Sequence, residues 1–253
     1  VLMDTTTLFK VFRQESSEEI LSQVSLLPET IIQEQDTNGQ TLLHVAVFRN
    51  QLEVAAWLLN QGCDPNQKDM NQLSPFIAAA ANGLDEMFHL LLHYSPDLTE
   101  TNRFGGTALL PSSEKGYLRV VQQALDAGVP VNHINRLGWT ALLEAAILGD
   151  DGFLFRDIIE ALIQAGADVT INDFTNQTAI DYATQAKAES ILEILKEEVQ
   201  QTQFTEIKTL LRSQQSLLGI KKLLTFPNSL EKYYYLGYAY ESLKRYAAAE
   251  YYY

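Results

Sequence analysis

The stretch that decides the fold is Thr140-Ala141-Leu142-Leu143, because its pattern occurs several times in the chain. Earlier copies are Thr41-Leu42-Leu43-His44, Ser74-Pro75-Phe76-Ile77 and Thr107-Ala108-Leu109-Leu110, so the step from one copy to the next is a constant 33 residues. A fifth copy, Thr178-Ala179-Ile180-Asp181, follows 38 residues after the fourth. A fixed period of this length is typical of a solenoid made of stacked structural repeats.

Each unit predicts two helices. The Thr or Ser that opens a copy is a good N-cap, since its hydroxyl accepts a hydrogen bond from a backbone N–H of the first helical turn. A second helix follows with apolar pairs such as Leu58-Leu59, and it ends at a glycine such as Gly62 or Gly166, which tolerates the left-handed C-terminal conformation. Turn-forming residues, for example Asp36-Thr37-Asn38-Gly39, precede the first helix. We therefore expect an all-α chain of helix-turn-helix units with short β-turn fingers.

These landmarks resemble the ankyrin repeat, whose pattern is a turn with Gly, Thr-Pro-Leu-His, a small residue, Leu-Leu and Gly-Ala-Asp. Thr41-Leu42-Leu43-His44 with Gly62-Cys63-Asp64, and Thr140 with Gly166-Ala167-Asp168, match best. The resemblance implies an ankyrin-repeat solenoid over about residues 36–199. The five expected repeats are 36–68, 69–101, 102–134, 135–172 and 173–199.

Some positions depart from the family pattern. Gln72 replaces the turn glycine, and Pro111 lies inside an expected first helix. Five extra residues, at about 150–154, lengthen the fourth repeat. Such insertions commonly become surface loops, so Phe153 and Phe155 are secondary binding candidates. The alternative is that these phenylalanines fold over the core or extend the second helix.

The two ends of the chain differ from the repeats. Residues 1–35 are expected to form a degenerate helical unit that caps the solenoid. Residues 200–253 are expected to form a helical tail, which resembles the start of a tetratricopeptide repeat through Tyr233, Leu236-Gly237 and Tyr240. An unrelated helical hairpin is the alternative. The chain starts without methionine and stops at Tyr253 within an expected helix, which is compatible with a piece of a longer protein.

The composition is that of an ordinary globular chain, because 46% of the 253 residues are apolar and 20% are charged. The net charge of −14 disfavours nucleic acid, because binding to a phosphate backbone needs clustered Lys and Arg. The tail from 204 holds seven basic and four acidic residues, +3, which leaves −17 for residues 1–203. No apolar stretch is long enough to cross a bilayer, and one cysteine suits a reducing compartment, so we expect a cytoplasmic location.

Neither catalysis nor a cofactor is expected, since the sequence lacks a phosphate loop, a nucleophile elbow and a zinc-protease helix. His89 and His93 share a helix face, but no third metal ligand is evident, so we expect no metal site. The resemblance gives His44 a structural role between turn and helix. Cys63 is expected to be a packing thiol.

What the resemblance implies is recognition of a protein or peptide through the concave face formed by finger tips and first helices. The central hypothesis is that large apolar and arginine side chains there grip an apolar segment that bears acidic groups, because such residues are typical hot spots. Trp139 is expected to be an exposed contact, although Phe104 and Leu137 could instead pack finger against finger. The expected partner-binding residues are Arg103, Phe104, Arg136, Leu137, Trp139, Met70, Leu73, Arg49, Phe48 and Phe174.

The leading function is thus a non-enzymatic adaptor or scaffold, with a second contact possible at the tail. Two alternatives stay open. The chain could be the recognition arm of a longer enzyme or effector, with a catalytic domain beyond residue 253, or an acidic regulatory inhibitor of a basic site. The sequence does not predict the oligomeric state.

Overall fold

In the computed structural model, which describes residues 3–25 and 27–253, the chain divides into two compact units, Val1–Ile194 and Leu195–Tyr253. The described residues form helices and no strand, as the sequence predicts. The helices are α1 (Thr5–Gln14), α2 (Ser17–Val24), α3 (Glu29–Ile32), α4 (Leu42–Phe48), α5 (Leu52–Asn60), α6 (Pro75–Ala81), α7 (Asp85–Leu92), α8 (Leu109–Glu114), α9 (Leu118–Ala127), α10 (Ala141–Leu148), α11 (Phe153–Gln164), α12 (Ala179–Ala186), α13 (Glu189–Arg212), α14 (Ser216–Leu223), α15 (Leu230–Ser242) and α16 (Tyr246–Tyr252).

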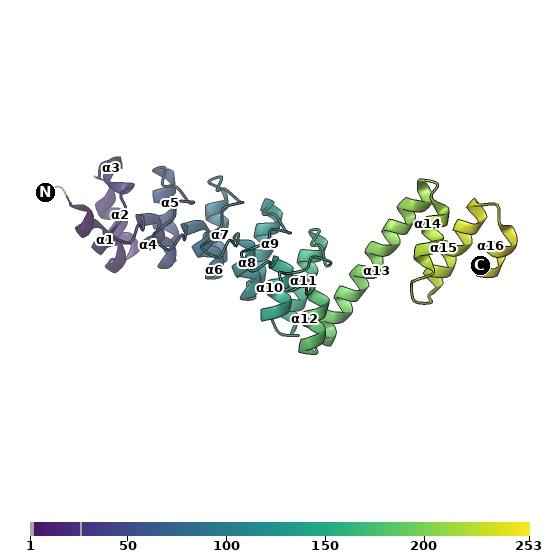
Figure 1. Cartoon of the computed structure of the whole chain (residues 1–253). Helices are drawn as coiled ribbons and strands as arrows, with labels where there is room; N and C mark the ends of the chain where they lie inside the picture. The colour runs from purple at the N-terminus through teal and green to yellow at the C-terminus, as the bar shows by residue number, and fades with distance from the viewer. Residues whose placement is uncertain (1–2, 26) are drawn as a thin grey trace. The chain divides into compact units, whose positions relative to one another are not determined.

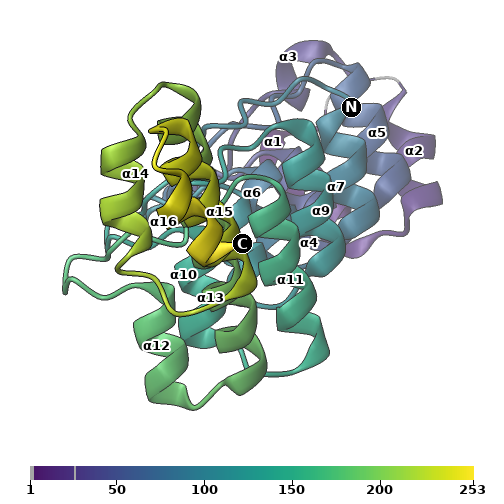
Figure 2. The same ribbon diagram turned by 90° about the vertical axis from the view of Figure 1, so that its right-hand side faces the viewer.

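The first unit is a stack of helix pairs (Figure 1). The first helices α4, α6, α8, α10 and α12 form one row, and the second helices α5, α7, α9 and α11 form another, each packed on its neighbour in the row. Figure 2 shows the stack of repeats from its end. Leu58, Phe76, Phe88 and Leu162 are among the fully buried side chains between the rows. Apolar side chains every three or four residues on each helix explain this layered core.

A finger precedes each first helix, and we define the five fingers as residues 36–40, 69–73, 102–106, 135–139 and 173–177. Each is closed by an Asp or Asn whose Oδ1 accepts hydrogen bonds from the backbone N–H groups two and four residues later. In the fourth finger, Asn135 accepts from Leu137 at 2.9 Å and Trp139 at 3.0 Å. The equivalent residues in the other fingers are Asp36, Asp69, Asn102 and Asp173.

The predicted N-caps are present in four of the five copies. Thr41, Ser74, Thr140 and Thr178 each accept from the backbone N–H three residues later. The prediction is wrong for Thr107, whose buried hydroxyl has no partner among the described residues, while α8 begins only at Leu109. The reason is Pro111, which has no N–H to donate to the Thr107 carbonyl, so Leu110 N–H donates to it instead.

His44 joins the first repeat to the second. Its Nδ1 accepts from the Thr41 backbone N–H at 3.0 Å, so its Nε2–H is left to donate to the Leu73 carbonyl at 2.8 Å. The ring is fully buried, and burial lowers its pKa, which keeps it neutral. The structural role expected for His44 agrees with this geometry.

Where the sequence predicts a helical cap, the described N-terminal residues form α1, α2 and α3. Phe9 and Phe12 of α1 are buried against the first repeat, where α1 packs on α4.

Cys63 is a buried free thiol, and burial raises its pKa to about 11, so it packs rather than reacts.

The second unit consists of the C-terminal part of α13 with α14, α15 and α16. Its core contains Phe204, Ile207, Leu211, Ile220, Leu223, Leu236 and Ala239. Gly237 is needed for close packing, because a Cβ there would lie 2.7 Å from the Tyr253 ring. The expected boundary at 199/200 falls inside α13, and the compact units divide five residues earlier. The resemblance to a tetratricopeptide repeat stays a prediction.

We expect His44→Ala to lower the free energy of unfolding by about 2 kcal/mol, because the Leu73 carbonyl and the Thr41 N–H lose a buried partner. The melting temperature should fall by roughly 4–8 °C in a circular-dichroism melt. His89→Ala, at an exposed site on α7, is the control and should melt like the parent chain. Equal melting of both variants would show that the His44 bonds contribute nothing.

Candidate protein-binding surface

The finger tips divide into two sets. Met70, Arg136 and Phe174 directly follow the closing Asp or Asn, and each lies against the preceding finger. At Gly138, which has a φ of +81°, a Cβ would lie 2.8 Å from the Phe174 backbone nitrogen. Phe174 and Met70 remain 76% and 73% exposed. This position therefore provides the finger-to-finger packing.

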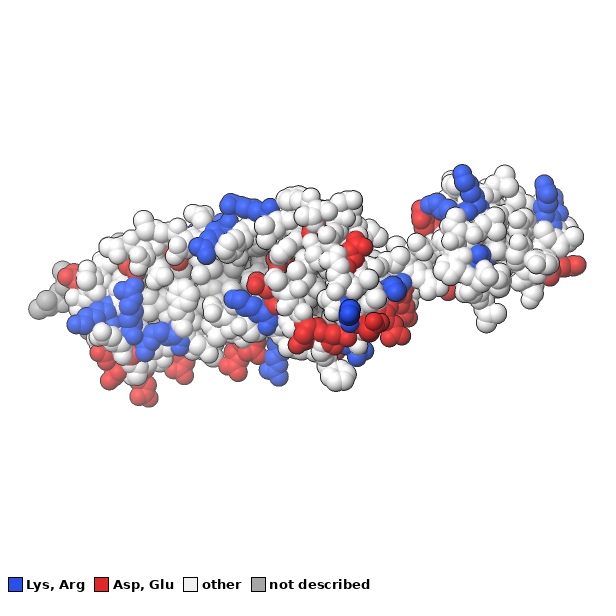
Figure 3. All heavy atoms as spheres, turned by 60° about the horizontal axis from the view of Figure 1, so that its bottom comes forward, with Lys and Arg blue, Asp and Glu red and all other residues white. Residues whose placement is uncertain are grey.

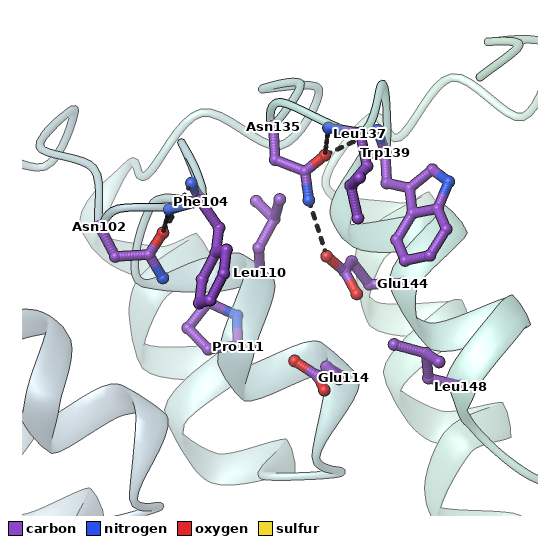
Figure 4. A pocket seen from close by; sticks show the side chains of 11 residues that line it. Asn102, Phe104, Leu110, Pro111, Glu114, Asn135, Leu137, Trp139, Glu144 and Leu148 are labelled. Carbon is purple, nitrogen blue, oxygen red and sulfur yellow. Dashed lines mark hydrogen bonds between the residues drawn. The ribbon is translucent and has the colours of Figure 1, made fainter. Parts of the chain in front are cut away.

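Phe104 and Leu137 lie one position later in their fingers, and their side chains line a pocket. Each is 55% exposed, and both line a pocket of about 210 Å³ between the third and fourth repeats (Figure 4). Arg103 lies over the Phe104 ring, with its Cζ 4.7 Å from the ring centroid. Of the predicted central residues, Phe104, Leu137 and Trp139 line this pocket, whereas Arg103 and Arg136 are outside its lining. The remaining lining of the pocket comes from Asn102, Gly106, Leu110, Pro111, Glu114, Asn135, Glu144 and Leu148.

Trp139 is less exposed than the sequence suggests. Its side chain is half-buried, and its indole Nε1–H donates to Asp173 Oδ2 at 3.2 Å. Asp173 closes the fifth finger, so the indole links two fingers while one edge lines the pocket. Trp139 was expected to be exposed, but the structure leaves it half-buried, and its contact with a partner stays a prediction.

Glu144 is a pocket residue that the sequence reasoning missed. It lies in the first turn of α10, and only 7% of its surface is exposed. Asn135 Nδ2 donates to its Oε1 at 2.9 Å. The sequence could have indicated this residue, because the equivalent positions in the other repeats are Val45, Ala78, Pro111 and Tyr182. A carboxylate at this position breaks a largely apolar pattern.

Burial raises the pKa of Glu144 to about 7, and the negative charge of Glu114 contributes to the rise. The hydrogen bond from Asn135 opposes it. Glu114 comes from α8, on the other side of the pocket. The pocket thus combines aromatic and aliphatic walls with two carboxyl groups.

The outlying predicted residues have mixed surroundings. Arg49 Nη1 donates to the carbonyls of Phe12 at 2.6 Å and Glu15 at 2.7 Å, so this arginine fastens the N-terminal cap. The Leu73 carbonyl is occupied by His44. Phe48 is 44% exposed on α4, apart from the pocket lining. The pocket itself lies in the third and fourth repeats.

The insertion does not form the expected loop around Phe153 and Phe155, because α11 already starts at Phe153. Phe153 and Leu154 belong to α11, in line with the stated alternative of a longer second helix, whereas Asp150, Asp151 and Gly152 lie outside the helix. The Phe155 ring packs against Gly149, where an added Cβ would collide with it. Phe153 is 81% exposed. Asp151 accepts from the backbone N–H groups of Ser190 at 3.1 Å and Ile191 at 2.9 Å, and so caps α13.

His89 and His93 pack ring to ring at 4.7 Å, and His93 Nδ1 is bonded to the His89 carbonyl. Residues 3–25 and 27–253 contain no group of three side chains placed to hold a metal ion. In the same part of the chain, no helix has the length and apolar character needed to cross a membrane.

Charges are mixed on the face shown in Figure 3, where Lys and Arg side chains are separated by acidic and uncharged ones. Among the described residues of the first unit, Arg119 forms an ion pair with Asp85 at 3.1 Å, and Arg13 forms one with Asp36. On this face the basic side chains do not join into the continuous track that a nucleic-acid backbone needs.

This architecture defines a helical repeat solenoid with fingers along one edge. Comparison with known proteins agrees: ankyrin repeats in three copies match residues 76–173, and one further ankyrin repeat matches residues 38–70. The ankyrin repeat protein YahD of Escherichia coli is 33% identical over 161 residues, 63% of this chain and 80% of that protein. An ankyrin repeat domain from Acinetobacter baumannii superposes with a TM-score of 0.72 at 35% identity, covering 77% of this chain and 98% of its own.

The chain belongs to the ankyrin repeat family, as the sequence predicts. Human NF-kappa-B inhibitor alpha is a further relative, 36% identical over 104 residues, which are 39% of this chain and 33% of that protein. Membership makes the chain a protein–protein interaction module in general terms.

Two phenylalanines of α11 allow a matched test of the insertion. Phe155→Ala should lower the free energy of unfolding by about 2–3 kcal/mol, because it empties a packed site over Gly149. Phe153→Ala should change it by less than about 0.5 kcal/mol, since the ring is mostly in water. Urea unfolding followed by circular dichroism measures both. A larger loss for Phe153→Ala would contradict the packing described.

Glu144 makes stability depend on pH. The unfolded chain ionises this group near its ordinary pKa of 4.5, but the folded chain does so near 7, so folding favours the protonated form. The stabilisation is fully present below about pH 4.5 and is lost as the pH rises through 7.

Glu144→Gln keeps an acceptor for Asn135 without the charge. We therefore expect the melting temperature of this variant to lie roughly 2–4 °C above that of the parent at pH 8. At pH 4.5 the two melting temperatures should be the same. Differential scanning calorimetry across this range measures the difference. Glu160→Gln, at an exposed site on α11, is the control and should show no such trend. A constant difference at all pH values would rule out titration of Glu144.

Proposed function

We propose that this chain is a non-enzymatic adaptor or scaffold that holds a segment of a partner protein on the concave centre of repeats three and four. The observation that carries the proposal is the pocket between Phe104 and Leu137, two large apolar side chains that are each 55% exposed. Exposed apolar groups gathered at one concave place mark interaction sites, whereas scattered ones do not.

Arg103 and Arg136, which directly precede Phe104 and Leu137 in the chain and are here called the rim, support the same proposal. Arg103 and Arg136 are exposed on the third and fourth finger tips of a chain with net charge −14. Arginine and aromatic residues dominate the energetics of protein interfaces. We propose that these two arginines contact acidic groups of the partner while Phe104 and Leu137 contact apolar ones.

The partner is proposed to be protein rather than nucleic acid, because the acidic chain would repel a phosphate backbone. The setting is proposed to be the cytoplasm, where the buried free thiol of Cys63 would stay reduced. A family relative, NF-kappa-B inhibitor alpha, is named for action on another protein, which is the kind of role proposed here.

The tail unit offers a further surface, which we propose as a second protein contact. A hollow of about 530 Å³ lies there, lined by Leu224, Asn228, Lys232, Tyr233, Leu236, Tyr251 and Tyr252. Tyrosines are well suited to contacts because they combine apolar area with a hydroxyl. Tyr251 is 83% exposed.

The double variant Phe104→Ala/Leu137→Ala tests the main surface. It removes two exposed side chains, so the fold should melt within about 2 °C of the parent. Affinity for the dominant partner captured from a lysate of the source cells should fall at least thirtyfold, a loss of ~2 kcal/mol. Trp139 is left in place because it also bonds the fifth finger.

Phe153→Ala, which removes an exposed phenylalanine from α11, is the matched control and should bind like the parent. Quantitative mass spectrometry of captured proteins followed by calorimetry of the purified pair gives both values. Unchanged affinity in the double variant, or an equal loss in the control, would overturn the proposed surface.

A further inference from the structure

The charge inside the central pocket differs from the charge at its rim. Its lining contains the carboxyl groups of Glu144 and Glu114, and no Lys, Arg or His side chain lines it among the described residues. Glu144 is nine-tenths buried, which is unusual for an acidic residue that has no ion pair. Figure 4 shows its carboxyl group in the space between α8 and α10.

The two carboxylate oxygens of Glu144 differ in their hydrogen bonding. Asn135 Nδ2 donates to Oε1 at 2.9 Å, while no hydrogen bond to Oε2 is found in the described part of the chain. A buried carboxylate lacking a countercharge costs free energy, and an incoming cation would remove that cost.

We propose that this pocket takes the side chain of a lysine from the partner protein, with its ammonium group between Glu144 and Glu114 and its aliphatic stem against Phe104 and Leu137. The inference rests on the proposed function, because it names the chemistry that the same concave site selects. The methylene groups of lysine pack on apolar walls while the charged end reaches its partner.

The size of the pocket fits this occupant. Four methylene groups and the ammonium need roughly 150 Å³, taking about 30 Å³ for each heavy atom from the volume share of a water molecule. The pocket has about 210 Å³. Arg103 already lies over the Phe104 ring, so the Trp139 ring, which lines the same space, is the aromatic group left to attract the ammonium.

Lysine suits the geometry better than arginine does. A guanidinium bonds most strongly to both oxygens of one carboxylate at once, and Oε1 of Glu144 is already held by Asn135. An ammonium is a compact charge that can use the one remaining oxygen and the second carboxylate of Glu114. Together with the arginines at the rim, the site then favours a lysine flanked by acidic residues.

The experiment is a titration of the full chain, labelled with ¹⁵N, with Nα-acetyl-lysine methylamide at pH 8 and 150 mM salt. The indole N–H signal of Trp139 reports on the pocket, and that of Trp57 on α5 serves as the internal control. We expect saturable shifts at Trp139, Leu137 and Phe104, with half-saturation on the order of 1–10 mM. Trp57 should not move.

Matched probes and variants isolate the charge. Nα-acetyl-norleucine methylamide has the same stem without the ammonium and should bind at least tenfold more weakly. Glu144→Gln should weaken the lysine probe at least tenfold and leave the norleucine probe unchanged. Glu160→Gln should bind both probes like the parent chain.

Three results would overturn the inference: no shift at Trp139, equal binding of the lysine and norleucine probes, or full binding by Glu144→Gln. Tighter binding of Nα-acetyl-arginine methylamide would overturn the choice of lysine. These failures are distinct from failure of the proposed function, which is decided by partner affinity of the Phe104→Ala/Leu137→Ala variant.

Discussion

Closure of each finger by one Asp or Asn side chain is the interaction on which the rest of the binding face depends. The Oδ1 atom accepts two backbone N–H groups. Two backbone bonds of the same residue complete the turn, as where Asn135 N–H donates to the Trp139 carbonyl and Gly138 N–H donates to the Asn135 carbonyl. One position then lies against the preceding finger, as in Phe174, and the next lines the pocket, as in Phe104. The repeated closure of the fingers thereby fixes the side chains from which the proposed surface is built.

The second polar atom of the same residue gives each repeat its individual character. In the fourth repeat, Asn135 donates its spare N–H to Glu144, nine residues later. In the fifth, Asp173 accepts from Tyr182, also nine residues later, and from the Trp139 indole. The first three repeats carry apolar residues at the later position, where no such bond can form. The pocket is acidic because the fourth repeat has Glu144 where the first three repeats have an apolar residue, and Asn135 donates a hydrogen bond to this carboxyl group.

Much of this structure can be predicted from the sequence, because repetition multiplies a weak signal. The 33-residue step, the N-cap hydroxyls and the apolar pairs place the helix pairs of all five repeats, and the family follows from them. Local exceptions cannot be read so easily. Pro111 delays the start of α8. In the insertion, α11 begins at Phe153, so that the Phe155 ring packs against Gly149 and does not lie in a loop.

The site was predictable only in part. Finger-tip positions follow from the repeat register, so Phe104 and Leu137 could be selected as central residues. The half-burial of Trp139 could not, since it depends on Asp173 from a neighbouring finger 34 residues away. Glu144 could be noticed as a carboxylate at a largely apolar repeat position, but its raised pKa could not be predicted, because it arises from burial and from the charge of Glu114 on α8, against the hydrogen bond from Asn135.

Site-directed photocrosslinking tests the central claim most directly. The photoreactive residue p-benzoylphenylalanine would replace Leu137 in one preparation and Phe153 in another, and each would be irradiated in a lysate of the source cells. The account predicts a discrete crosslinked protein from position 137 that is absent from position 153. A crosslink from position 153 alone, with none from 137, would contradict the concave centre as the binding site.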